Sequence, residues 1–195
     1  MALTRQSVDR RAALLDAARQ IFAAKGVEAA RVSEIVARAG VAQGTFYLYF
    51  TSKASLALAL TDKVYAEIRE EVARALAAER HVAGQVSAGV AAAFRAIERN
   101  RDIFAIVHPR GGGGEIRQEG ERLFAPYYAL VADAIRAGQE RREIPLDITP
   151  DLVARLVVDV IDSAAYACYV LGDTRSVESY LAAVTRFIQR GLGME

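Results

Sequence analysis

A short run near the N-terminus carries the side chains best suited to contact a polar or charged partner. Between Val41 and Phe50 the sequence reads VAQGTFYLYF, and Phe46 and Phe50, four residues apart, can both face inward on a helix. Groups that can hydrogen-bond are then left mostly outward, on Gln43, Thr45, Tyr47 and Tyr49. Amides and hydroxyls on one side of a helix suit contact with phosphates and base edges, and the amide of Gln43 can bond an adenine through two atoms.

Two short helices are expected to position these side chains. Ile35 and Val36 give the first helix an inward face, and Gly40 supplies the positive-φ position that ends it. Val41 then returns to the core, and residues 43–49 form a second helix set across the first. This arrangement is a helix-turn-helix, in which the second helix lies in the major groove of DNA.

The helix-turn-helix and the residues on either side of it resemble a known protein family. The run GVAQGTFYLYFTSKASLALAL resembles the recognition helix and the following helix of the TetR family of bacterial transcription regulators, whose pattern is roughly G-V-S-x-G-T-(L/F)-Y-x-(Y/H)-F-x-(S/N)-K-x-x-L. This chain meets the pattern at Gly40, Val41, Gly44, Thr45, Phe46, Tyr47, Tyr49, Phe50, Ser52, Lys53 and Leu56. The upstream run RRAALLDAARQIFAAKGVEAARVSEIVARAG resembles the first two helices of the family. The likeness spans residues 8 to 60 and says little about the rest.

The sequence departs from the family pattern at two capping positions. Ala42 stands where the family prefers Ser as the cap of the recognition helix, and the pair Ala30-Arg31 stands where Thr usually precedes the helix before it. Arg31 offers a phosphate contact in place of that cap, and Ser33 lies where family members often contact DNA. Gly44, in the recognition helix, is counted with the expected DNA contacts.

Ser52 and Lys53 open the next helix, with Ser52 as its expected cap. A cation near a helix N-terminus is unfavourable unless an anion lies nearby, and a DNA phosphate would satisfy both Lys53 and the free backbone N–H groups. We therefore expect Lys53 to contact a phosphate. The simpler alternative is a solvated lysine.

Positive charge is concentrated in the same part of the chain. Residues 1–53 hold eight Lys and Arg against four Asp and Glu, a surplus of four, whereas the whole chain has a net charge of +1, so the remainder carries a deficit of three. This asymmetry is expected if only the first part meets phosphate, although chance unevenness is the alternative. We divide the chain into a helix-turn-helix DNA-binding domain, residues 1–53, and an effector-binding and dimerisation domain, residues 54–195.

The fold is predicted to be all-α. The chain of 195 residues is rich in alanine, has only 4 prolines, and shows little strand-like alternation. Beyond the helix-turn-helix, helices are expected over residues 8–24, 52–80, 85–100, 102–107, 115–142, 151–171 and 176–191, with a kink or break at Pro126. The N-terminus lacks an apolar signal core, and residues 151–171 carry too many charges for a membrane span. A cytoplasmic protein without membrane contact is expected.

No catalytic site, metal site or cofactor is predicted. Cys168 is the only cysteine, so a disulfide or a cysteine-cluster metal site within the chain is excluded; it is expected to be a buried apolar residue, with redox sensing as the alternative. His81 and His108 lie in neither a metal-ligand spacing nor a nucleophile motif. The run Gly111–Gly114 lacks the Gly-Lys-Ser/Thr ending of a phosphate loop. It is either a passive loop or a mobile gate beside a ligand cavity.

The last two predicted helices have the clearest interaction pattern of the second domain. In the TetR family these helices pair with their symmetry mates in a four-helix bundle. Dimerisation is assigned to Leu152, Leu156, Val160, Val177, Leu181, Val184 and Ile188, with burial inside the monomer as the alternative. A two-fold dimer would read a palindromic operator in double-stranded DNA, whose half-sites lie about one helical turn, ~34 Å, or multiples of it apart.

The family usually holds an effector among the middle helices of this domain. Carried over to this chain, the candidate lining residues are Phe94, Phe104, His108, Tyr127, Tyr128, Tyr166 and Tyr169, although aromatic residues at helical spacing are usually core. An apolar cavity with polar tips suits a small acyl-type, aromatic or lipophilic drug-like effector. The leading hypothesis is a homodimeric repressor that such an effector releases from its operator. The alternative is a DNA-bound protein that recruits a protein partner without a small-molecule switch.

Overall fold

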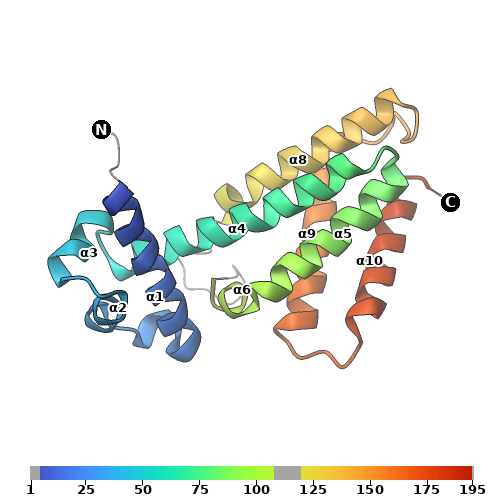
Figure 1. Cartoon of the computed structure of the whole chain (residues 1–195). Coiled ribbons are helices and arrows are strands. Elements are labelled where there is room, and N and C mark those ends of the chain that lie inside the picture. The colour runs from blue at the N-terminus through green and yellow to red at the C-terminus, as the bar shows by residue number, and fades with distance from the viewer. Residues whose placement is uncertain (1–4, 108–119, 195) are drawn as a thin grey trace. The chain divides into compact units, whose positions relative to one another are not determined.

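The computed structural model describes residues 5–107 and 120–194, and every regular element in these ranges is an α-helix (Figure 1). The helices are α1 (Arg5–Ala29), α2 (Val32–Ala39), α3 (Gln43–Tyr49), α4 (Lys53–Ala78), α5 (Val82–Arg99), α6 (Arg101–Val107), α8 (Gly120–Glu140), α9 (Pro150–Tyr169) and α10 (Val177–Gly191). The all-α prediction is confirmed. None of the helices within the described ranges has the length and apolar character that a membrane crossing requires.

The chain forms two compact units. The first runs to Val64 and takes in α6 from Asp102 onward, whereas the second contains the rest of α4 from Tyr65, together with α5, α8, α9 and α10. The predicted division after residue 53 would fall at the start of α4, but the two units divide within that helix. Helix α4 is therefore shared between the units.

Two glycines set the helix ends in the first unit. Gly26, with φ 78° and ψ 166°, interrupts α1 where the sequence predicts its end, although α1 begins at Arg5, three residues earlier than expected. Gly40 ends α2 with φ 66°, and the N–H of Val41 donates to the carbonyl of Val36 at 3.1 Å. Only Gly adopts such φ values without strain, so the turn that delivers α3 is encoded locally.

Burial of aromatic side chains holds α3 in place. A helix of seven residues is too short to be stable alone in water. Phe46 and Phe50 are buried, with ring centroids 5.9 Å apart. Each buried phenylalanine contributes roughly 1.5–3 kcal/mol. The fully buried side chains of Leu14, Phe22 and Ile35, on α1 and α2, belong to the same unit.

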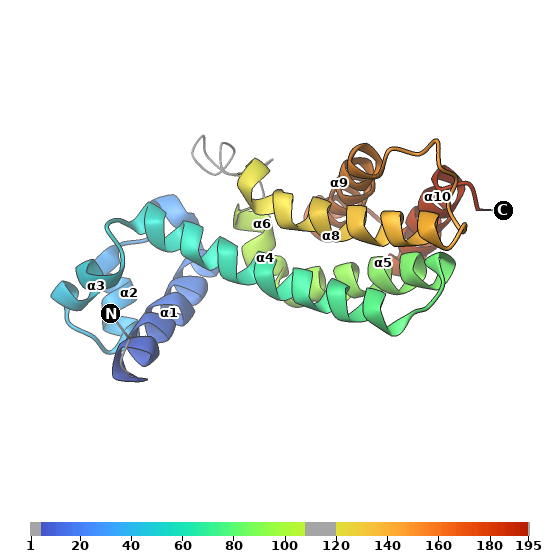
Figure 2. The ribbon, with the colours of Figure 1, turned by 90° about the horizontal axis from the view of Figure 1, so that it is seen from above.

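In the second unit, α9 packs against α8, α10 and α5, and α10 also packs against α5 (Figure 2). Buried residues of this unit include Val90, Phe94, Ile97, Ala154, Ala165, Val184 and Ile188. Of the kink or break predicted at Pro126, the break does not occur: α8 continues through this residue. A proline removes one backbone hydrogen bond, and the helical turns on either side keep theirs.

The N-terminus of α3 lacks a side-chain cap, which makes Ala42 a test of the structure. Ala42 is the N-cap residue, with φ −70° and ψ 150°, and only its carbonyl is used, accepting from the N–H of Thr45 at 2.9 Å. We expect Ala42→Ser to raise the free energy of unfolding by about 0.5–2 kcal/mol, because the hydroxyl can accept a free N–H of the first turn. Thermal unfolding measures this change.

The matched control is Ala37→Ser on the exposed side of α2. Its N–H is already inside a helix, so serine there gains no capping bond and should leave stability unchanged or slightly lower. Equal gains from both substitutions would contradict the placement of the α3 start at Ala42.

Candidate nucleic-acid interface

The outward side of α3 differs from the predicted set of residues. Gln43, Gly44, Tyr47 and Leu48 are exposed, whereas Thr45 and Tyr49 are half-buried. The prediction took every second residue from Gln43 to Tyr49, but a helix turns about 100° per residue, so positions spaced i, i+1, i+4 and i+5 share a side. Gln43 and Tyr47 therefore keep their expected orientation. Thr45 and Tyr49 instead lie at the margins of this side.

Tyr47 has an orientation set by the core beneath it. Its ring meets the buried ring of Phe46 edge-on, with centroids 5.2 Å apart and an interplanar angle of 81°, and 56% of its surface stays exposed. Edge-to-face pairs of this kind favour one geometry. The hydroxyl of Tyr47 is therefore presented on a supported side chain that needs little ordering when a partner binds.

Gly44 is not explained by the fold of this chain. Its backbone is in a conformation that any residue adopts, and a Cβ added to it would meet nothing within 4 Å. Glycine inside a helix costs about 1 kcal/mol relative to alanine. Neither a turn nor internal packing requires the missing side chain, and the close approach of DNA to this side of α3 stays a prediction.

Lys53 is held within the first unit rather than directed to solvent. Its ammonium donates to the carbonyl oxygens of Glu28 at 2.7 Å and Ala30 at 3.0 Å, at the end of α1. Carbonyls at a helix end lack helical partners and carry partial negative charge. The sequence predicts a phosphate as the partner of the Lys53 ammonium. Two of the three N–H groups of this ammonium instead bond to the end of α1 and so join it to the first turn of α4. A phosphate contact through the third stays a prediction.

The start of α4 is capped as predicted. The hydroxyl of Ser52 accepts the N–H of Ser55 at 3.0 Å, and the hydroxyl of Ser55 accepts the N–H of Ser52 at 3.1 Å. This reciprocal pair satisfies two backbone donors. The expected cap is confirmed, and it leaves fewer free N–H groups at this end for a phosphate.

Glu34 takes over the capping of α2. Its carboxylate accepts the backbone N–H of Arg31 at 2.9 Å and pairs with the ammonium of Lys25. The hydrogen bond from Lys25, followed by that from Arg31, holds the pKa of Glu34 below its usual value. Arg31 and Ser33 are both exposed, as the predicted DNA contacts require.

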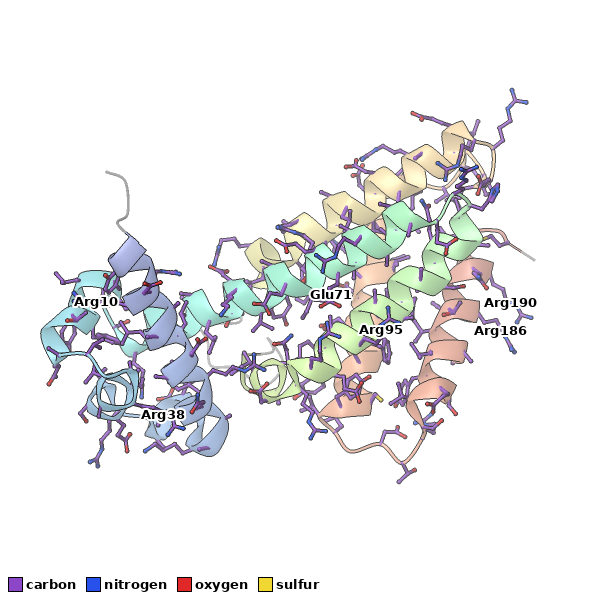
Figure 3. The ribbon with its side chains drawn as sticks, in the orientation of Figure 1. Arg10, Arg38, Glu71, Arg95, Arg186 and Arg190 are labelled. Atoms are coloured by element: carbon purple, nitrogen blue, oxygen red, sulfur yellow. The ribbon has the colours of Figure 1, made fainter. Side chains whose placement is uncertain are left out.

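Two further arginines of the first unit were missing from the predicted set. Arg10 on α1 and Arg38 on α2 are exposed, and in the described part of the chain neither pairs with a carboxylate (Figure 3). The side chain of Arg38 donates to the amide oxygen of Gln20 at 2.5 Å, which leaves its charge uncompensated. Both are candidates for phosphate contacts. No motif marks them, and the charge surplus of residues 1–53 was the signal that pointed to this region.

The predicted effector residues are divided between the two units. Phe104 is buried in α6 of the first unit, and His108 lies outside the described residues, as does the run Gly111–Gly114. Phe94, Tyr127, Tyr128, Tyr166 and Tyr169 belong to the second unit. The hydroxyl of Tyr127 donates to the carbonyl of Tyr65, and burial raises its pKa well above the usual value. Tyr166 is half-buried.

The hydroxyls of Tyr128 and Tyr169 differ in whether they have a hydrogen-bond partner. The hydroxyl of Tyr128 donates to Asp159 at 3.1 Å, and the guanidinium of Arg155 lies 4.6 Å from its ring centroid, so this side chain is engaged at the surface. The hydroxyl of Tyr169 is buried without a hydrogen-bond partner in the described residues, and its ring lies 5.9 Å from that of Phe94. Burial raises the pKa of Tyr169 to about 12, so the hydroxyl keeps its proton at neutral pH.

The predicted dimer residues also fall into separate groups. Leu152 and Leu156 are exposed on α9, and Val160, Val177 and Leu181 are half-buried. Val184 and Ile188 instead belong to the core of the second unit, because the same helical spacing that marks an interface also marks an inward face. Phe187, which lies between these two residues in the sequence, is 65% exposed.

Two family models match the chain. A model for bacterial regulatory proteins of the tetR family covers residues 14–60, and a model for a tetracyclin repressor-like C-terminal domain covers residues 86–192. The chain belongs to the TetR family. The resemblance seen in the helix-turn-helix run is confirmed, and the second match extends it through most of the second unit.

Relatives and solved structures agree with membership of the TetR family. The uncharacterized HTH-type transcriptional regulator YvdT of Bacillus subtilis is 26% identical over 181 residues, which cover 92% of this chain and 93% of its own length. The fatty acid degradation regulator FadR from Bacillus halodurans has a TM-score of 0.80 at 21% identity, covering 95% of this chain and 97% of that chain. FadR from Bacillus subtilis in complex with stearoyl-CoA has a TM-score of 0.75 at 22% identity, covering 93% and 96%.

Substitution of Gly44 separates folding from DNA binding in this TetR-family regulator. Gly44→Ala should raise the free energy of unfolding by up to ~1 kcal/mol, because the helical backbone accepts alanine and the added Cβ meets nothing. The variant should bind a duplex recovered by in vitro selection about tenfold more weakly, a loss of ~1.4 kcal/mol, because the methyl group fills space that the groove would occupy.

Thermal unfolding and a fluorescence-anisotropy titration measure the two effects of Gly44→Ala. Ala42→Ser is the control, since it should stabilise the same helix while keeping DNA affinity. Undiminished DNA binding by Gly44→Ala would show that this glycine does not lie against DNA.

Proposed function

We propose that this TetR-family regulator is a homodimeric repressor that a small lipophilic effector of acyl type releases from a palindromic operator. The exposed side of α3 carries the proposal: Gln43, Gly44, Tyr47 and Leu48 stand outward on a helix whose opposite side is buried. In the major groove, the Gln43 amide would bond an adenine edge. Exposed Arg10, Arg31 and Arg38 would contact phosphates on either side.

Exposed apolar residues on α9 and α10 support a dimer. Leu152 and Leu156 on α9 are more than half exposed, as is Phe187 on the neighbouring α10. Arg186 and Arg190 also project from α10 (Figure 3). A group of exposed large apolar residues bordered by charges is typical of the core and rim of a protein interface. TetR-family regulators act as dimers, and two copies of the first unit, the DNA-binding head, are needed to read two half-sites.

The unpaired hydroxyl of Tyr169 supports a ligand in the second unit. A buried donor without a partner costs about 1–3 kcal/mol, and an acceptor on a bound ligand would recover part of that cost. The adjacent ring of Phe94 supplies apolar contact. Among acyl-type, aromatic and drug-like effectors we favour the acyl type, because a FadR of the same fold was solved with stearoyl-CoA and a Bacillus subtilis relative, 23% identical over 164 residues, is named a fatty acid metabolism regulator.

Two helices offer a route from such a ligand to the DNA-binding head. Helix α4 begins in the first unit and ends in the second, and α6 follows α5 directly but belongs to the first unit. Arg19 on α1 donates to both carboxylate oxygens of Asp102 on α6, at 2.9 and 2.7 Å. A bidentate pair fixes the relative orientation of its two helices. A ligand that favours a second placement of α4 or α6 would shift the population toward a form that releases DNA.

Footprinting on the DNA upstream of the protein's own gene tests the proposal. The full-length protein should protect a two-fold symmetric site, and stearoyl-CoA should lower the occupancy of that site. If no palindromic site is protected, the proposed function is wrong. A protected site that stearoyl-CoA and shorter acyl-CoA molecules leave fully occupied would favour the alternative, in which the second unit recruits a protein partner.

Tyr169→Phe tests the effector site separately from DNA binding. Removing the unpaired hydroxyl should raise the melting temperature of the ligand-free protein, because up to about 1–3 kcal/mol of burial cost disappears. The same change should reduce the stabilisation by stearoyl-CoA and leave operator affinity intact. Differential scanning fluorimetry with and without stearoyl-CoA measures both effects.

The matched control for Tyr169→Phe is Tyr180→Phe, since the hydroxyl of Tyr180 already donates to Asp173 at 2.8 Å. This control should lower stability slightly and leave the response to stearoyl-CoA unchanged. An undiminished response in Tyr169→Phe would contradict the assigned role of that hydroxyl.

A further inference from the structure

Among the side chains of the first unit, Leu48 is the one whose exposure the fold of that unit explains least. It is 80% exposed, and among the described residues of that unit the exposed large apolar side chains are Leu48 and its neighbour Tyr47. Tyr47 has a hydroxyl that water can solvate and a ring packed on Phe46. Leu48 has no polar atom in its side chain, so only an apolar partner can use it.

The position of Leu48 on α3 limits what that partner can be. It follows Gly44 by four residues, so the two lie one turn apart on the same side of the helix, and Gln43 and Tyr47 flank them. The missing side chain at Gly44 lets an outside surface come close to the helix backbone. Any surface that reaches Gly44 therefore also meets Leu48.

Double-stranded DNA offers one apolar feature in the major groove, the 5-methyl group of thymine. We propose that Leu48 is a specificity-determining residue that packs against a thymine methyl group in each half-site of the operator. This inference rests on the proposed function, because it places α3 in the major groove. Leu48 discriminates thymine from cytosine and from uracil by contact with the methyl group alone.

Leu48 and Gln43 read different base pairs. They are five residues apart, and a rise of 1.5 Å per residue separates them by about 7.5 Å along the helix axis. Each can therefore be changed without removing the contact of the other. A thymine preference assigned to Leu48 is independent of an adenine preference assigned to Gln43.

The test removes the methyl group from the DNA and the leucine from the protein, separately and together. A duplex is first recovered by in vitro selection with the full-length protein. Each thymine is then replaced singly by deoxyuridine, which lacks the methyl group and keeps every hydrogen-bonding edge. The dissociation constant of each duplex is measured for the wild-type protein and for Leu48→Ala.

We expect removal of the thymine methyl group and removal of the Leu48 side chain to weaken DNA binding through the same contact, so that either change cancels the effect of the other. The wild-type protein should bind about fourfold more weakly when one particular thymine of a half-site loses its methyl group, the factor expected for one buried methyl. Leu48→Ala should bind the unmodified duplex more weakly and should not respond to deoxyuridine at that position. Leu146→Ala, which truncates a leucine of similar exposure in the second unit, should behave as the wild type throughout.

Two outcomes overturn the inference and leave the proposed function intact. One is a wild-type protein that responds to deoxyuridine at no position of a selected duplex. The other is an equal response in the wild type and in Leu48→Ala, which shows that another residue contacts the methyl group. Failure to select any duplex would overturn the proposed function itself, and this inference with it. Because Leu48 is exposed, an unchanged melting temperature should show that Leu48→Ala is folded.

Discussion

Burial of Phe46 and Phe50 is the interaction on which the DNA-binding head depends. Helix α3 has seven residues and no side-chain cap, so it has almost no stability of its own in water. The two phenylalanines fix its inward side, and Lys53 joins the following helix to the end of α1. The positions of the exposed side chains of α3 are therefore set by contacts that its buried side makes. The head positions the exposed residues of α3 through packing rather than through helix propensity.

The sequence predicted those parts of the head that local chemistry decides. Glycine at positions 26 and 40 is needed for φ values that other residues avoid, and the ends of α1 and α2 follow from it. The bonds from Lys53 to the carbonyls of Glu28 and Ala30 were not predicted, because these atoms lie more than twenty residues earlier in the chain. Residue type alone does not show which distant backbone atoms tertiary packing brings within reach.

The same limit applies to apolar residues. A leucine or valine at helical spacing can face the core or a partner, and the sequence could not separate Leu152 and Leu156 from Val184 and Ile188. On α3 the prediction considered only polar residues and therefore omitted Leu48. Helical geometry places Leu48 on the side opposite Phe46, so its outward position could have been predicted. The assignment of α6 to the first unit depends on tertiary contacts that no local pattern records.

Pairing within the head limits how many cations remain for the DNA backbone. Arg19, Lys25 and Lys53 are each bonded to oxygen atoms of the first unit. The exposed arginines without a carboxylate partner in the described residues of that unit include Arg10, Arg31 and Arg38. Each phosphate that a cation neutralises releases condensed counterions and adds about −0.9 to the salt dependence of binding. If these three arginines contact phosphates in both subunits of a dimer, six contacts give a slope of about −5 in log affinity against log salt, so affinity should fall steeply as ionic strength rises.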